Sequence, residues 1–300
     1  MRVRLLLPLL LCSLFVTARA QVEIQLEFDQ NQFLPHEKTE LILRMINYTG
    51  EPLRLGEQPG WIRFSVENID GTVVNRIEDL EETGAFTLKP SARGTLRFNL
   101  APLFKLDQIG RYKVTATVST GSRNEHIVSA PVEFEIMSGV VLWEREFGFA
   151  GSQGTRRKYM IQQANYLNRP RLYASVTDPL DASACRVIRL GTVVSFNPPS
   201  DFMLDATNRL HVIHQVGADD FIHHCIGSHG DVIIRNIYAN RSGRPSLGMN
   251  DDGEVTVIHG RRKPNPGDIP SPPSSKTVSN ASTTASPVVL PKAKPVPPSP

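Results

Sequence analysis

Six of the eight histidines lie in the second half of the chain, and they are the residues whose spacing could build a reactive centre. If a tight turn centred on Ala218-Asp219 joins two strands, His214 lies directly opposite His223, with Cys225 as a diagonal neighbour on the same face. Imidazole nitrogens and a thiolate are ligands that Zn²⁺ and Cu accept. The spacing therefore predicts a metal site of His214, His223 and Cys225. Half-buried strand histidines without any cofactor are the alternative, because a one-residue change of register would separate the faces.

Two cysteines, Cys185 and Cys225, remain if an N-terminal export signal is removed. Exported proteins often carry disulfides, so a Cys185–Cys225 bridge is one prediction. The two residues occupy nearly equivalent places in adjacent repeats, however. Stacked sheets lie about 10 Å apart, whereas a disulfide needs its Cα atoms within roughly 7 Å. Two free thiols are therefore the alternative.

Common catalytic templates are missing from the sequence. It contains neither a Gly-x-Ser-x-Gly elbow nor a His-Glu-x-x-His pair, and no glycine-rich phosphate loop follows a predicted strand. The paired carboxylates Asp219-Asp220 and Asp251-Asp252 fall in predicted hairpin turns, where turn chemistry accounts for them. The sequence therefore favours a protein that is not an enzyme.

The first 20 residues predict an export signal. Two arginines precede an apolar run over 5–16, and Ala18-Arg19-Ala20 is a small-x-small cleavage site, so we expect the mature chain to begin at Gln21. The apolar run is too short to span a bilayer, which takes about 20 residues, and no later segment is apolar enough. We therefore expect a secreted or periplasmic protein without a transmembrane segment.

Residues 21–138 are predicted to form an antiparallel β-sandwich. Apolar and polar residues alternate over 22–28 and 62–67, and Asp70-Gly71 is a hairpin turn signal. The stretch 107–116, with Tyr112, resembles the tyrosine corner of immunoglobulin-like sandwiches, and residues 33–50 resemble a bacterial extracellular Ig-like or proteinase-inhibitor-like module. The resemblance implies an Ig-like fold and leaves the function open.

Residues 139–262 are predicted to hold repeated antiparallel sheets. A strand–turn–strand pattern occurs over 159–196, again over 202–238, and begins a third time over 246–260. In the third copy Asn250-Asp-Asp-Gly-Glu-Val-Thr-Val resembles the strand start of sialidase-type β-propeller blades. The resemblance implies about two and a half propeller-like blades, fewer than the four that a closed ring takes. The blades would stack incompletely or be completed by another copy of the chain, and plain antiparallel sheets are the alternative; no sialidase catalytic residue carries over.

The chain carries 33 basic and 30 acidic residues, and three of the basic residues lie in the expected signal. A neutral mature chain lacks the basic surface of a nucleic-acid-binding protein. Residues 263–300 are rich in proline and contain no aromatic residue, which predicts a disordered tail.

Together these features predict a secreted or periplasmic, non-enzymatic binding module at the cell envelope, with a protein or a glycan as its ligand. The alternative is a hydrolase or metal-binding protein with a site within 159–260.

Overall fold

The structure is a computed structural model that describes residues 22–81, 84–120, 125–148, 156–179, 185–194, 200–241, 243–265 and 268. Every regular element within these residues is a β-strand, which confirms the expected all-β class for this part of the chain. None of the described residues forms a helix long and apolar enough to cross a membrane. The expected export signal, 1–20, lies outside the described residues, as does the expected tail apart from residues 263–265 and 268.

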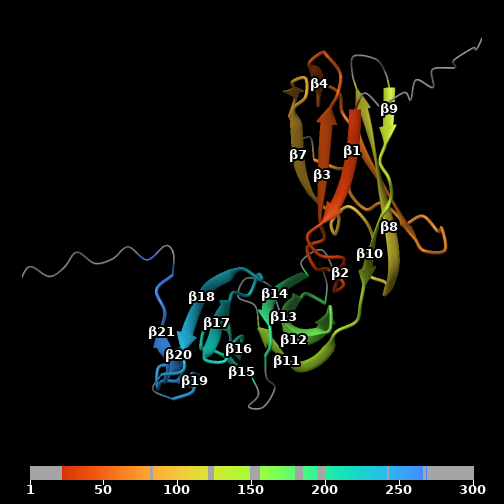
Figure 1. The fold of residues 1–300 in the computed structure, drawn as a ribbon. Helices are drawn as coiled ribbons and strands as arrows, with labels where there is room; N and C mark the ends of the chain where they lie inside the picture. The colour runs from red at the N-terminus through yellow and green to blue at the C-terminus, as the bar shows by residue number, and fades with distance from the viewer. Residues whose placement is uncertain are drawn as a thin grey trace, which may run out of the picture. The chain divides into compact units, whose positions relative to one another are not determined.

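The first ten strands form two main sheets around one apolar core (Figure 1). One sheet has the strand order β1-β3-β7; the other has the order β2-β10-β8-β5, with β9 also paired to β8, and β4 pairs with β6 in a small separate sheet. All pairs are antiparallel except β2 with β10. The strands are β1 (Val22–Phe28), β2 (Gln32–Phe33), β3 (Glu40–Asn47), β4 (Leu53–Leu55), β5 (Ile62–Asn68), β6 (Phe86–Leu88), β7 (Arg93–Asn99), β8 (Gly110–Thr120), β9 (Glu125–Val128) and β10 (Val132–Ile136).

Alternation along the strands explains this core. In β8 every second residue from Tyr112 to Thr120 is buried, because successive side chains of a strand point to opposite faces. Leu41, Leu43 and Met45 of β3 are fully buried from the facing sheet. Each such aliphatic side chain stabilises the fold by about 1.5–3 kcal/mol.

Tyr112 connects the loop before β8 to the core. Its hydroxyl donates to the carbonyl oxygen of Gln108 at 2.7 Å, just before β8 begins. Its ring stacks on Phe134 of β10, with 5.5 Å between the ring centroids. The side chain therefore ties the loop before β8 to the core.

The remaining strands form consecutive antiparallel sheets, each built largely from neighbours in the sequence (Figure 1). The first sheet has the order β11-β12-β13-β14, the second has the order β15-β16-β17-β18-β21, and β19 pairs with β20 alone. The strands are β11 (Val140–Gly148), β12 (Arg156–Tyr166), β13 (Arg169–Thr177), β14 (Arg186–Thr192), β15 (Asp201–Leu204), β16 (Leu210–Gln215), β17 (Asp220–Ile226), β18 (Val232–Ala239), β19 (Ser246–Met249), β20 (Val255–Ile258) and β21 (Arg261–Arg262).

The sheet that contains β16 and β17 is buried on both faces. Leu210, Val212 and Ile226 on one face pack with apolar residues of β12, β13 and β14. Ile213 and Phe221 on the other face pack with β19 and β20. Almost every residue of β16 and β17 is therefore buried, and any polar side chain in these strands must be neutral or hydrogen-bonded.

Two turns repeat the same geometry. In 205–209 and in 250–254 the first N–H donates to the fifth carbonyl (3.1 and 3.0 Å), and the fourth N–H donates to the first carbonyl (3.0 Å in both). The fourth residues, Asn208 and Gly253, have φ angles of 60° and 76°, a region that asparagine and glycine enter most readily. The N–H of Ala206 donates to the carbonyl of Gly253 at 2.9 Å, so the equivalent turns of adjacent sheets contact each other.

Candidate functional site

The cluster of buried histidines comes from the β16–β17 hairpin, whose register differs from the predicted one. Two N–H groups, of residues 216 and 217, donate to the carbonyl of Asp220 at 2.8 and 3.3 Å and close a three-residue loop over 217–219. His223 consequently lies opposite Ile213 and not opposite His214. The predicted facing of His214 and His223 is wrong, because the loop is one residue longer than a two-residue turn and the shift moves alternate side chains to opposite faces.

One face of the hairpin brings His211, His223, Cys225 and Asp205 together. His211 Nδ1 lies 3.0 Å from His223 Nε2, and His211 Nε2 lies 3.3 Å from Asp205 Oδ2. The sulfur of Cys225 lies 3.6 Å from the same His211 Nε2. All four side chains are almost completely buried.

Asp205 determines which ring nitrogens of His211 and His223 carry a proton. Burial alone would raise the pKa of its carboxyl group, but hydrogen bonds from Arg209 and Thr207 lower that pKa to about 2. The carboxylate is therefore ionised and accepts a hydrogen bond from His211 Nε2–H. His211 Nδ1 then accepts from His223 Nε2–H, so the hydrogen bonds run from His223 through His211 to Asp205.

Apart from Asp205, the titratable side chains of this face are held in their neutral forms. Burial lowers the pKa of His211 despite the carboxylate beside it, and burial together with His211 lowers the pKa of His223 to about 4. Burial also raises the pKa of the Cys225 thiol to about 11, so the sulfur is protonated and a weak nucleophile. At physiological pH the two histidines and the thiol of this face are therefore neutral, and Asp205 is the charged member of the network.

The opposite face carries His214 and His224, which pack toward the first sheet. Their rings are stacked, with 5.7 Å between the centroids and 11° between the planes. Burial, with a further contribution from Arg235, lowers the pKa of His214 to about 4; burial, followed by the nearby His214 and Arg235, lowers the pKa of His224 to about 3. Both nitrogens of His214 and the Nδ1 of His224 are buried without a hydrogen-bond partner among the described residues.

The predicted metal site is not formed. His214 lies on the face toward the first sheet, whereas His223 and Cys225 lie on the face toward β19 and β20, so these three side chains do not converge on one point. Within the described ranges, no group of three His, Cys, Asp or Glu side chains is arranged to hold a metal ion. The geometry on which the prediction of Zn²⁺ or Cu bound by His214, His223 and Cys225 depended is therefore not found in this structure.

The predicted disulfide is also absent. Cys185 and Cys225 are both free, Cys225 completely buried and Cys185 half-buried just before β14. The face that packs on the first sheet carries Leu210 and Val212, and Cys225 points to the other face. Because Cys225 points away from the sheet that contains β14, the two sulfur atoms cannot meet.

A second buried polar cluster joins the first ten strands to the later sheets, and the sequence did not indicate it. Glu37 accepts hydrogen bonds from Gln30 Nε2 and from the Leu34 N–H, both at 2.9 Å. Gln30 Oε1 in turn accepts from Arg171 Nη1 at 2.8 Å and from Arg189 Nη1. Burial raises the pKa of Glu37 even though these hydrogen bonds and the two arginines oppose it. Gln30 and its arginine partners are separated by more than 130 residues, so no local sequence pattern could indicate this cluster.

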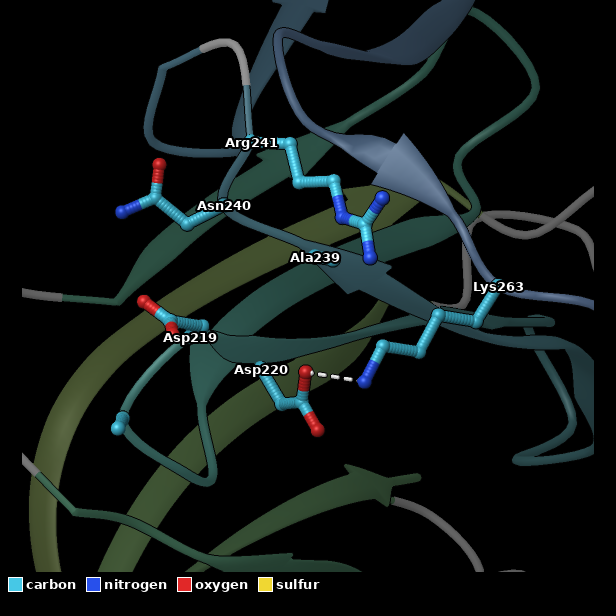
Figure 2. A pocket seen from close by; sticks show the side chains of 7 residues that line it. Asp219, Asp220, Ala239, Asn240, Arg241 and Lys263 are labelled. Carbon is cyan, nitrogen blue, oxygen red and sulfur yellow. Dashed lines mark ion pairs between the residues drawn. The ribbon is translucent and has the colours of Figure 1, made fainter.

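An open polar hollow of about 390 Å³ lies at the ends of β17, β18 and β21. Figure 2 shows the side chains of Asp219, Asp220, Asn240, Arg241 and Lys263 around it. Lys263 Nζ pairs with Asp220 Oδ1 at 2.6 Å. The side chains of Asp219, Asn240 and Arg241 have no partner within the described part of the chain, so they are available to a ligand.

A larger hollow of about 690 Å³ lies beside the Glu37 cluster. Leu34, Phe104 and Leu106 supply apolar surface, while Glu37 and Cys185 supply polar groups. None of the four buried histidines lines either hollow.

No protein-family model matches this chain, and no curated protein matches it. Among solved structures, it is similar to the crystal structure of Spo0M, a sporulation control protein from Bacillus subtilis. That similarity covers 82% of this chain and 91% of that chain, at 11% sequence identity and a TM-score of 0.29. At this TM-score the likeness supports no conclusion about fold or function.

Proposed function

We propose that this chain is an exported, non-enzymatic binding protein of the cell envelope, with a protein or a glycan as its ligand. Its first 138 residues include an Ig-like sandwich, and residues 139–262 are propeller-like repeats that serve as a scaffold for binding loops.

The strand order supports the Ig-like part of this proposal. β1, β3 and β7 occupy one sheet and β5, β8 and β10 the other, as strands A, B, E and C, F, G do in an Ig sandwich. The hydrogen bond from Tyr112 to Gln108 lies at the start of β8, where such a sandwich has its tyrosine corner. The propeller-like part is supported by the consecutive four-stranded meanders β11–β14 and β15–β18 and by the repeated turns 205–209 and 250–254.

The proposed binding role rests mainly on where the reactive side chains lie. A general acid, base or nucleophile must reach the atoms of its substrate. His211, His214, His223 and His224 are at most 4% exposed, and the nearby Cys225 is completely buried. The accessible hollows are instead lined by hydrogen-bonding side chains and apolar surface, which suit recognition.

The test is capture of ligand from the envelope of the native host by the immobilised mature chain, residues 21–300, with a metal assay on the same preparation. We expect specific retention of an envelope component by the folded chain and none by the heat-unfolded chain. Lack of any retained component would contradict the binding role. Near-stoichiometric metal, or turnover of a retained component, would favour the hydrolase or metal-binding alternative.

A further inference from the structure

The hollow in Figure 2 is built on loops that are held in place before any ligand arrives. Gln215 Nε2 donates to the carbonyls of Gly217 and Ala218 at 2.9 and 3.0 Å, which fixes the β16–β17 loop. The N–H of Asn240 donates to the carbonyl of Asp219 at 2.8 Å and ties the end of β18 to this loop. A site whose walls are already ordered loses less conformational entropy when it binds.

Lys263, the residue after β21, completes the hollow. The N–H of Lys263 donates to the carbonyl of Ile237 at 2.7 Å, and its ammonium group pairs with Asp220. This ion pair uses one positive and one negative charge of the hollow. The groups that remain for a ligand are the carboxylate of Asp219, the amide of Asn240 and the guanidinium of Arg241.

These three groups have complementary hydrogen-bonding properties. The Asp219 carboxylate only accepts, the Arg241 guanidinium only donates, and the Asn240 amide does both. The two charges cancel, so the hollow does not select a strongly anionic or cationic ligand. Neighbouring hydroxyl groups on a sugar ring match this set, because each hydroxyl both donates and accepts.

We propose that this hollow binds a neutral sugar unit of an envelope glycan, with Asp219, Asn240 and Arg241 contacting its hydroxyl groups. This rests on the proposed binding function and assigns the glycan, rather than a protein, as the ligand. The volume of about 390 Å³ is large enough for one sugar ring. The hollow is also open to solvent, so a sugar unit within a longer glycan can enter it.

The experiment uses the immobilised mature chain and the native envelope fraction in three forms. One form is untreated, one is oxidised with periodate, which cleaves vicinal diols, and one is digested with protease. We expect capture from the untreated and the protease-treated fractions and its loss after periodate. Loss after protease with retention after periodate would overturn the glycan assignment while leaving the binding function intact, whereas no capture from any fraction would contradict both.

Two substitutions locate the site. Asp219→Ala and Arg241→Ala each remove a charged hydrogen-bonding partner, and we expect about tenfold weaker capture of the protease-treated fraction. The matched control Asp251→Ala removes an exposed carboxylate from the β19–β20 turn and should bind as the unmodified chain does. Unchanged capture by both Asp219→Ala and Arg241→Ala would overturn the assignment to this hollow. Capture that disappears when the salt concentration is raised would overturn the assignment of a neutral sugar, because screening by salt weakens the binding of a charged ligand.

Discussion

Replacing His224 with glutamine should make the chain less sensitive to acid. His224, His214 and His223 are buried and neutral, with pKa values of about 3, 4 and 4, below the ordinary value of 6.5. The unfolded chain therefore binds protons that the folded chain does not, once the pH falls below about 6.5. Stability from these three groups is fully present above that pH and is lost as the pH falls toward about 4.

The size of this effect follows from the linkage relation. At pH 5 each of the three histidines favours the unfolded chain by about 2 kcal/mol relative to pH 8, which makes about 6 kcal/mol for the three. His211, whose pKa burial also lowers, acts in the same sense in the unmodified and the substituted chain. Ordinary domains are stable by about 5–15 kcal/mol, so the repeats should approach unfolding near pH 5. His224→Gln should reduce the loss between pH 8 and pH 5 to about 4 kcal/mol. Glu37, whose pKa is raised by burial, acts in the opposite sense and equally in both proteins.

The assay is urea unfolding at pH 8 and pH 5, followed by the fluorescence of Trp143 in a Trp61→Phe background. Trp143 packs against Phe202, with 6.1 Å between the ring centroids, so its signal reports on the packing of the repeats. Comparing the two pH values removes any packing cost of the substitution itself. The control His126→Gln changes an exposed histidine and should lose the full 6 kcal/mol or so. The reasoning is refuted if His224→Gln loses as much stability as the unmodified chain, or if the unmodified chain is equally stable at both pH values.

Three further predictions concern stability. Tyr112→Phe should destabilise the first ten strands by about 1 kcal/mol in urea unfolding, because it removes the hydrogen bond to the preceding loop. The control Tyr48→Phe removes only a solvent-exposed hydrogen bond to Glu23 and should have little effect. Gly253→Ala should cost about 2 kcal/mol, because φ is 76° there and the new Cβ would lie 2.8 Å from that of the neighbouring turn; Gly50→Ala, with open space around it, is the control, and equal melting temperatures would contradict this account. Deletion of all residues after Lys263 should leave the melting temperature unchanged, since the expected tail has almost no apolar surface to bury, and a fall of several degrees would show that it docks.

Strands that bury one face and expose the other to water were predictable from the sequence. β1, β5 and β8 have alternating apolar and polar residues, and the structure contains these strands. The turn over 250–254 was equally readable, because Gly253 marks the position with positive φ. The parallel pairing of β2 with β10 had no local signal, because it joins segments about 100 residues apart and involves only two residues of each strand.

The candidate site was only partly predictable. The sequence indicated that histidines of β16 and β17 lie close together, and the structure does bring His211 against His223 and His214 against His224. The predicted partners were wrong because a single residue in the loop decides the register, and loop length cannot be read reliably from composition. Burial on both faces was also missed, since it depends on sheets that lie on either side of the hairpin and not on the hairpin's own sequence.

The β16–β17 hairpin links acid sensitivity to the proposed ligand site. Its strands carry the buried histidines, its loop carries Asp219, and β17 begins with Asp220; both aspartates line the hollow. Protonation that separates these strands would also displace the loop, because Gln215 at the end of β16 holds it in place. We therefore expect glycan capture to fall with the same acid midpoint as Trp143 fluorescence, and His224→Gln to shift both midpoints downward together. Capture that persists below the unfolding midpoint, or that fails while the repeats remain folded, would show that the hairpin does not couple the two.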